Sequence, residues 1–104
     1  MRVCALVADL MDRSKITAAS ADVVFVRDAA ACAGADVVVV DLARFGGEVG
    51  PARAVAPLAR LVCFGPHVDD AGVAAATAAG ADVVLPRSKF FRDPGAAISA
   101  PGAL

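Results

Sequence analysis

Five apolar runs in this sequence lack alternation with polar residues, and they limit the possible fold more than any other feature. The runs fall at about residues 2–8, 22–26, 36–41, 60–65 and 82–85, and four consecutive valines form the third. A strand with one face in water alternates apolar and polar residues, whereas a strand covered on both faces reads as a continuous apolar run. The pattern therefore predicts a five-stranded parallel sheet with helices on both faces.

Alanine-rich segments separate these runs, and a glycine marks the end of two of them. The phrase GADVV occurs at 34–38 and at 80–84, as expected where a helix ends at glycine and a strand follows. Capping residues or an early proline open the segments, which predicts helices over 12–20, 28–34, 50–59, 69–80 and 88–99. Asp12 is the expected cap of the first helix.

Five strand–helix units in 104 residues predict a single three-layer α/β domain over 1–99, with a frayed tail over 100–104. A six-stranded dinucleotide fold is longer, and no GxGxxG follows the first apolar run. We therefore expect the flavodoxin-like fold, with a parallel sheet in the order 2-1-3-4-5.

Composition excludes several classes of function. The net charge of −1 leaves no basic field for nucleic acid, and no apolar run approaches the roughly 20 residues that span a bilayer, so a cytoplasmic protein is expected. The cysteines, Cys4, Cys32 and Cys63, show no CxxC spacing and lie in apolar stretches, which predicts reduced core residues. Zinc is disfavoured because His67 is the only histidine.

Two acidic residues follow central strands of the predicted sheet. Asp9 comes after the first strand and Asp41 ends the third, and in this strand order both face one crevice beyond the carboxyl ends of the strands. With VVVVDL at 37–42 and GADVVLPRSKF at 80–90, which is similar to the segment GAxxYLxKPF, the chain resembles CheY-like response-regulator receiver domains of two-component signalling.

The resemblance implies a set of site residues, and this sequence matches it only in part. Asp41 falls at the phosphoacceptor position, and Asp9 can supply at most one of the two acids that hold magnesium. The hydroxyl that contacts the phosphate is replaced by Gly65, and the lysine by Arg87. These departures indicate a degenerate pseudo-receiver site, in which Arg87 is expected to pair directly with Asp41.

The residues leave plainer interpretations open. Asp41 is equally suited to capping the next segment, and Asp9 and Asp12 suit a helix start better than a metal site. Adjacent Phe90 and Phe91 cannot share one helix face, so one is expected in the core and the other, beside Lys89 and Arg92, at a contact surface. The list of expected contact residues is therefore Lys89, Phe90, Phe91 and Arg92.

Three functions remain in order of preference. The first is a stand-alone bacterial pseudo-receiver, not an enzyme, that needs no cofactor and binds a protein partner or itself through its fourth helix, fifth strand and fifth helix. The second is a phosphorylatable single-domain response regulator, with Asp41 as phosphoacceptor and Asp9 and Asp41 as magnesium ligands. The third is a flavodoxin-like domain that binds a small molecule, although the sequence offers no phosphate-cradling loop.

Overall fold

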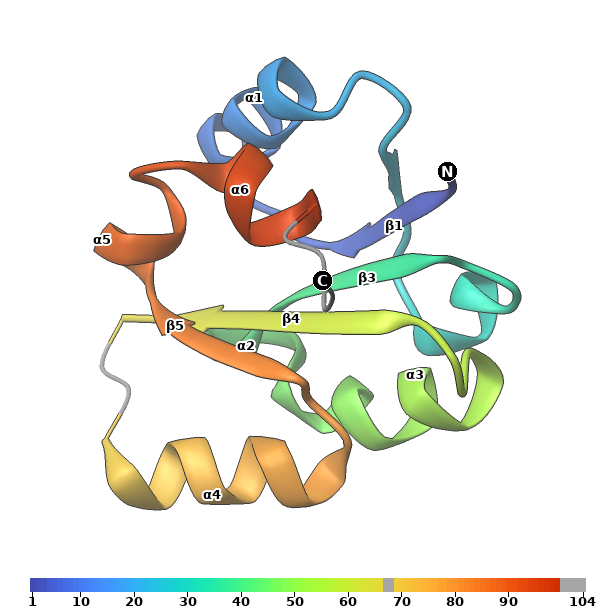
Figure 1. Cartoon of the computed structure of the whole chain (residues 1–104), viewed down its shortest axis with the longest axis vertical. Coiled ribbons are helices and arrows are strands. Elements are labelled where there is room, and N and C mark those ends of the chain that lie inside the picture. The colour runs from blue at the N-terminus through green and yellow to red at the C-terminus, as the bar shows by residue number, and fades with distance from the viewer. Residues whose placement is uncertain (67–68, 100–104) are drawn as a thin grey trace.

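A five-stranded, all-parallel sheet forms the centre of the protein (Figure 1). The structure is a computed structural model that describes residues 1–66 and 69–99, so His67 and the predicted tail 100–104 lie outside the described residues. The strand order β2-β1-β3-β4-β5 confirms the predicted flavodoxin-like arrangement. The strands are β1 (Val3–Leu6), β2 (Val24–Phe25), β3 (Val37–Asp41), β4 (Arg60–Gly65) and β5 (Val83–Pro86).

Helices cover both faces of this sheet. They are α1 (Leu10–Ala19), the 3₁₀ turn η1 (Ala29–Cys32), α2 (Leu42–Phe45), the 3₁₀ turn η2 (Gly46–Glu48), α3 (Val49–Val55), α4 (Asp70–Ala79), α5 (Arg87–Phe90) and α6 (Pro94–Ser99). Figure 1 shows α1, α5 and α6 on one face of the sheet and α3 and α4 on the other. Within residues 1–66 and 69–99, no helix has the length and apolar character needed to cross a membrane.

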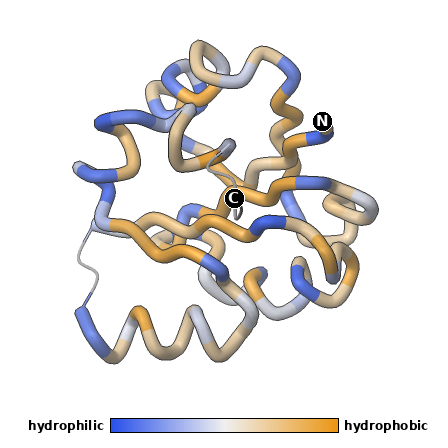
Figure 2. Tube along the Cα trace, viewed as in Figure 1, coloured by the Kyte–Doolittle hydropathy of each residue, from blue (hydrophilic) through white to orange (hydrophobic). Residues whose placement is uncertain are grey.

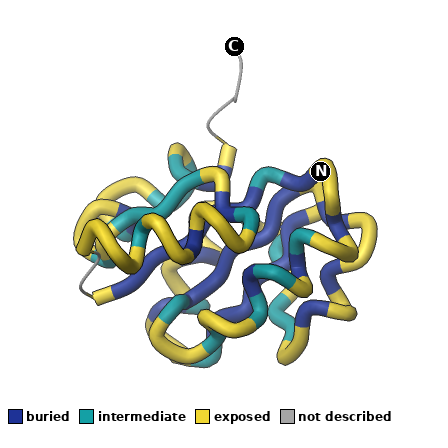
Figure 3. Tube along the Cα trace, turned by 90° about the horizontal axis from the view of Figure 1, so that it is seen from below, coloured by how far each residue is buried: buried dark blue, intermediate teal, exposed yellow. Residues whose placement is uncertain are grey.

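The valine-rich third strand is buried on both faces, as predicted. Val38 and Val40 pack in one core cluster with α3 and η1, whereas Val37 and Val39 pack in a second cluster with α1, α5 and α6. The pleat explains the division, because successive side chains of a strand point to opposite faces. Figures 2 and 3 show the result: the central strands β1, β3 and β4 are hydrophobic and almost entirely buried, and most exposed positions lie on the surrounding helices and loops.

The three cysteines are free and buried in the cluster that contains α3, which confirms the prediction of reduced core residues. Burial raises the pKa of the Cys32 thiol to about 11 and that of Cys63 to about 12, with the neighbouring Cys4 and Asp82 adding to these shifts. A thiol with so high a pKa has little thiolate at neutral pH and is therefore unreactive.

Several predicted helices differ from the structure: the segment 28–34 forms only the 3₁₀ turn η1, and the helix predicted over 50–59 ends at Val55. Asp9, not Asp12, caps α1, because its carboxylate accepts a hydrogen bond of 3.0 Å from the Asp12 amide. The helix predicted over 88–99 is split into α5 and α6, with Asp93 accepting from the Ala96 amide at 3.0 Å and Pro94 beginning α6. Proline has no amide hydrogen to donate and disfavours helical backbone in the residue before it, so the helix stops and restarts there.

Candidate functional site

The carboxyl ends of the four longer strands meet at one edge of the sheet and form the candidate site. Asp9 follows β1, Asp41 ends β3, Gly65 ends β4 and Arg87 begins the helix after β5. Asp41 lies opposite Phe64, and Gly65 lies opposite Pro86, in the pairing of adjacent strands. The sheet order alone thus brings these segments together, as the sequence predicted.

Asp41 is a buried acid with a local hydrogen-bond partner. Only 4% of the residue is exposed, and its Oδ1 accepts a hydrogen bond of 3.1 Å from the Ala43 amide, which caps α2. Burial raises the pKa of Asp41, and the hydrogen bond from Ala43 and the charge of Arg87 oppose that rise. The capping role that the sequence left open for Asp41 is therefore confirmed.

Asp12 and Arg87 form the strongest polar contact at this edge. The two terminal guanidinium nitrogens of Arg87 donate to the Asp12 carboxylate, with Nη2 at 2.7 Å from Oδ1 and Nη1 at 2.9 Å from Oδ2. The Asp12 side chain is 3% exposed and that of Arg87 38% exposed. The expectation that Arg87 pairs with Asp41 is therefore wrong, and its partner is an acid of α1.

The first turn of α1 explains this choice of partner. Because Asp9 caps the helix, Asp12 lies in the first turn on the same face as Ile16, one turn later, and both are buried. That face packs toward the sheet, so Asp12 points inward and needs a partner. The sequence carried one signal of this, the spacing of four between an acid and a core isoleucine.

Two aromatic rings lie beside the Arg87 guanidinium. Its carbon Cζ lies 5.5 Å from the centre of the Phe64 ring and 5.1 Å from that of Phe91. Phe64 also stacks on Phe90, with ring centres 4.7 Å apart. A planar guanidinium can bind a carboxylate through two parallel bonds while it packs against aromatic rings, whereas a lysine ammonium cannot form the two parallel bonds. The site is thus built for arginine.

Protein groups already engage each acid of this edge. Asp9, Asp12 and Asp41 all act electrostatically on the guanidinium and raise the pKa of Arg87, whose single positive charge offsets part of the negative charge of this edge. Asp9 caps α1, Asp12 is held by Arg87 and Asp41 caps α2. In the described ranges, no three histidine, cysteine or acidic side chains form a group that could hold a metal ion.

The expected contact residues divide between core and surface. Phe90 is fully buried, so its expected contact role is wrong and it is the core member of the phenylalanine pair. Phe91 is half-buried, with the Lys15 ammonium 5.4 Å from its ring centre. Lys89 and Arg92 are exposed and remain candidates for contact with a partner.

Solved structures similar to this chain include receiver domains and response regulators. The first is a response regulator from Burkholderia pseudomallei with a phosphorylated aspartic acid, calcium ion and citrate, with a TM-score of 0.79 and 14% identity over 94% of this chain and 66% of that chain. A CheY-like receiver domain protein from Methanospirillum hungatei gives a TM-score of 0.76 and 13% identity over 89% and 86%.

A third similar structure is the signal receiver domain of the response regulator NarL from Mycobacterium tuberculosis, with a TM-score of 0.69 and 20% identity over 90% and 89% of the two chains. No protein-family model and no curated protein matches the sequence. Identities this low establish a shared fold and leave the activity open. The chain therefore has the receiver-domain fold of the response regulators.

Proposed function

We propose that this chain is a pseudo-receiver: a cytoplasmic signalling module of receiver fold that acts through protein contacts and without phosphorylation of Asp41. The observation that carries the proposal is the two-bond ion pair between Arg87 and the buried Asp12. In this proposal, Arg87 supplies permanently the positive charge that a receiver of the resembled family takes from a metal ion.

Phosphoryl transfer to a carboxylate depends almost entirely on positioned charge and positioned hydrogen-bond donors. Here the guanidinium of Arg87 is held by Asp12, and one oxygen of Asp41 is held by the Ala43 amide. Gly65 offers no hydroxyl to a phosphate. Each group that would stabilise the transferred phosphoryl is therefore missing or already bound, which supports a site that does not react.

The contact surface that we propose consists of α4, β5 and α5. The exposed side of α4 is made mostly of alanine, and Ala76 is its only buried residue. A hollow of about 290 Å³ separates α4 from α2, and Lys89 and Arg92 are exposed on and just after α5. A thin, alanine-covered helix lets a partner helix approach closely, with basic side chains nearby for its acids.

Intact mass spectrometry tests the proposal. The protein is incubated with magnesium and an acyl phosphate. A receiver domain that accepts phosphoryl groups from the same donor is treated in a separate sample as the positive control. We expect no mass gain for this chain. A gain of one phosphoryl group that disappears in Asp41→Asn would refute the proposal and favour a phosphorylatable response regulator, with Asp9 and Asp41 as magnesium ligands.

Titration calorimetry with magnesium tests the role of Arg87 separately. The wild-type chain is expected to bind no magnesium, because Arg87 binds Asp12 while Asp9 and Asp41 cap helices. Arg87→Met frees the Asp12 carboxylate and is expected to gain weak binding, since one or two carboxylates suffice when waters complete the shell. Equal magnesium binding by both proteins would show that Arg87 does not occupy the place of the cation.

A further inference from the structure

Two exposed cations lie where α1 meets the segment that runs from α5 into α6, and neither has an acidic partner. Lys15 belongs to α1, and Arg92 lies between α5 and α6. Neither forms an ion pair in the part of the chain that the structure describes, and Asp93, the acid next to Arg92, caps α6. The chain as a whole has a net charge of −1, so this positive charge is a local feature.

Contacts spaced about one turn apart along α1 hold the segment 87–95 against this helix. They join Asp12 to Arg87, Lys15 to Phe91 and Ala19 to Gly95. The Lys15 ammonium lies 5.4 Å from the centre of the Phe91 ring. Figure 1 shows α5 and α6 beside α1, and α1 packs against α6. Lys15 and Phe91 therefore lie in the middle of a seam between two packed segments, and Arg92 directly follows Phe91.

Apolar groups accompany the cations of this seam. Met11 precedes Lys15 by four residues, and side chains at this spacing share one face of a helix. Met11 is 71% exposed, and Phe91 is half-buried with its inner side packed against other phenylalanine rings. Methionine is flexible and polarisable, and it is common at surfaces that bind partners. The basic–apolar patch, which consists of Met11, Lys15, Phe91 and Arg92, therefore offers contacts to both apolar and anionic groups.

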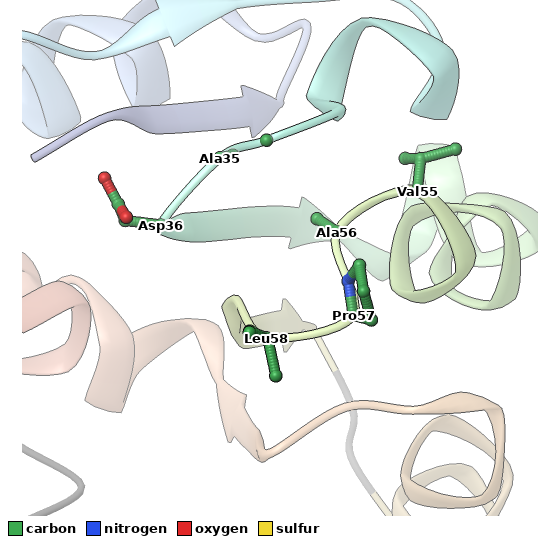
Figure 4. Close-up of a pocket in the computed structure, with 7 residues that line it drawn as sticks. Ala35, Asp36, Val55, Ala56, Pro57 and Leu58 are labelled. Atoms are coloured by element: carbon green, nitrogen blue, oxygen red, sulfur yellow. The ribbon is translucent and has the colours of Figure 1, made fainter.

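Another exposed apolar residue, Leu58, lacks such a charge signal. It is 98% exposed on the turn between α3 and β4, and it borders a hollow of about 280 Å³ (Figure 4). The charged groups around this turn are already bound within the chain: Arg53 binds Asp82 and carbonyl oxygens of the turn, and Asp36 accepts from the Arg2 amide. Nothing around Leu58 therefore identifies a partner, whereas the basic–apolar patch has unpaired charge of one sign.

We propose that the basic–apolar patch binds an acidic, amphipathic segment of a partner protein. An apolar side chain of that segment contacts Met11 and Phe91, and carboxylates on either side of it pair with Lys15 and Arg92. This inference rests on the proposed function, because it names the class of partner for a module that acts through protein contacts. The patch lies on the α1 side of α5 and shares only Arg92 with the α4, β5 and α5 surface.

The number of unpaired cations favours a peptide over other anionic partners. Proteins that bind DNA tightly make about 6–10 phosphate contacts, and segments that bind anionic membranes carry clusters of about 4–8 basic residues. Lys15 and Arg92 are too few for either. They match the two or three carboxylates of a short acidic segment, and the exposed Met11 adds an apolar contact that a phosphate backbone would not use.

NMR titration of the isotope-labelled chain with synthetic peptides tests the proposal. The first peptide has a leucine flanked by glutamates, the second has glutamines in place of the glutamates, and the third has glycine in place of the leucine. We expect the first peptide to shift the amide signals of Lys15, Phe91 and Arg92 and to bind more tightly than the other two. Binding is also expected to weaken as salt is added, because salt screens exposed charges.

Matched variants separate the patch from general charge and apolarity. Lys15→Gln and Arg92→Gln are each expected to weaken binding about 2–5-fold, as for the loss of one exposed ion pair. Arg44→Gln is the control, because Arg44 is an exposed cation of α2, on the other face of the sheet. Met11→Gln is expected to weaken binding and Leu58→Gln to leave it unchanged. All of these side chains are exposed, so unchanged circular dichroism is expected for each variant.

Charge reversal gives the sharpest outcome. Lys15→Glu combined with Arg92→Glu is expected to lose the glutamate peptide and to bind a peptide with lysines in place of the glutamates. The proposal is overturned if the wild-type chain does not bind the glutamate peptide, if Arg44→Gln weakens binding as much as Lys15→Gln does, or if an oligonucleotide or anionic phospholipid vesicles shift the same signals at lower concentration. These titrations use the unphosphorylated chain, so a negative result refutes the patch alone, whereas phosphoryl transfer to Asp41 refutes the proposed function.

Discussion

Replacing Arg87 by methionine is expected to destabilise the fold more than replacing any exposed arginine. The Asp12 carboxylate is 3% exposed and receives hydrogen bonds from Arg87 on both of its oxygens. Removing one partner of a buried ion pair costs about 3–5 kcal/mol, because the other charge is left buried and alone. Methionine keeps the aliphatic part of the side chain, so the change removes the guanidinium, with its charge and its contacts with the rings of Phe64 and Phe91.

The partial exposure of Arg87 lowers this figure. Its side chain is 38% exposed, so water reaches part of the pair and screens it. We therefore expect Arg87→Met to lower the free energy of unfolding by about 2–3 kcal/mol, a large share of the 5–15 kcal/mol typical of a domain. Asp12→Leu with Arg87→Met removes both charges and is expected to lie within about 1 kcal/mol of the wild-type protein.

Urea denaturation followed by circular dichroism measures these differences. The set consists of the wild-type protein, Arg87→Met, Asp12→Leu, the double variant and the exposed control Arg92→Met. The coupling energy of the pair is expected to be about 2 kcal/mol, and the control to lie within about 0.5 kcal/mol of the wild-type protein. If Arg87→Met lowers the free energy of unfolding no more than Arg92→Met does, the Asp12–Arg87 ion pair does not stabilise the fold and this prediction is refuted.

Three other predictions concern local features of the fold. Gly80→Ala is expected to lower the free energy of unfolding, measured by urea denaturation, by about 2–3 kcal/mol, because φ is +125° and a new Cβ would lie 2.7 Å from the Arg53 side chain. Gly50→Ala in α3 is the control, because open space surrounds Gly50, and equal effects of the two changes would contradict this expectation. Asp41→Asn is expected to stabilise the protein at neutral pH, because burial raises the pKa of the folded carboxyl. As pH falls, the folded wild-type protein protonates Asp41 before the unfolded chain does, which stabilises the wild-type protein. The advantage of Asp41→Asn in free energy of unfolding should therefore shrink as pH falls toward the pKa of the unfolded chain, and an advantage that is constant with pH would contradict this. Cys63, with a pKa of about 12, is expected to react with a thiol reagent only as fast as the protein opens, and rapid labelling under native conditions would contradict its burial.

Local sequence patterns were sufficient to predict the sheet. The run 60–65 corresponds to β4 residue for residue, and Val37–Val40 are buried on both faces as the lack of alternation required. Gly34 and Gly80 have φ of +76° and +125°, as expected for residues that end helices before strands. The split of the fifth helix could also have been predicted from neighbouring residues, because an aspartate followed by proline, as at Asp93–Pro94, commonly begins a new helix.

The partner of Arg87 could not be predicted in the same way. Arg87 and Asp12 are 75 residues apart in the sequence, and three acids lie close enough to act on the guanidinium. Which acid binds it depends on the rotation of α1 about its axis, which is set by the burial of Ile16 and the cap at Asp9. Neither of these can be read from the residues around Arg87.

The sequence by itself determined the five strand–helix units, the two-sided burial of the central strands and the position of Asp41 at a strand end. These features follow from hydrophobic patterns and backbone preferences, which act over a few neighbouring residues. Only the tertiary structure decided that Asp12 holds Arg87, that Asp41 caps α2 and that Arg53 orders the turn that exposes Leu58. The first of these contacts joins residues 75 positions apart and depends on how α1 is rotated in the packed fold, and the others depend on which of several open side-chain directions the packing selects.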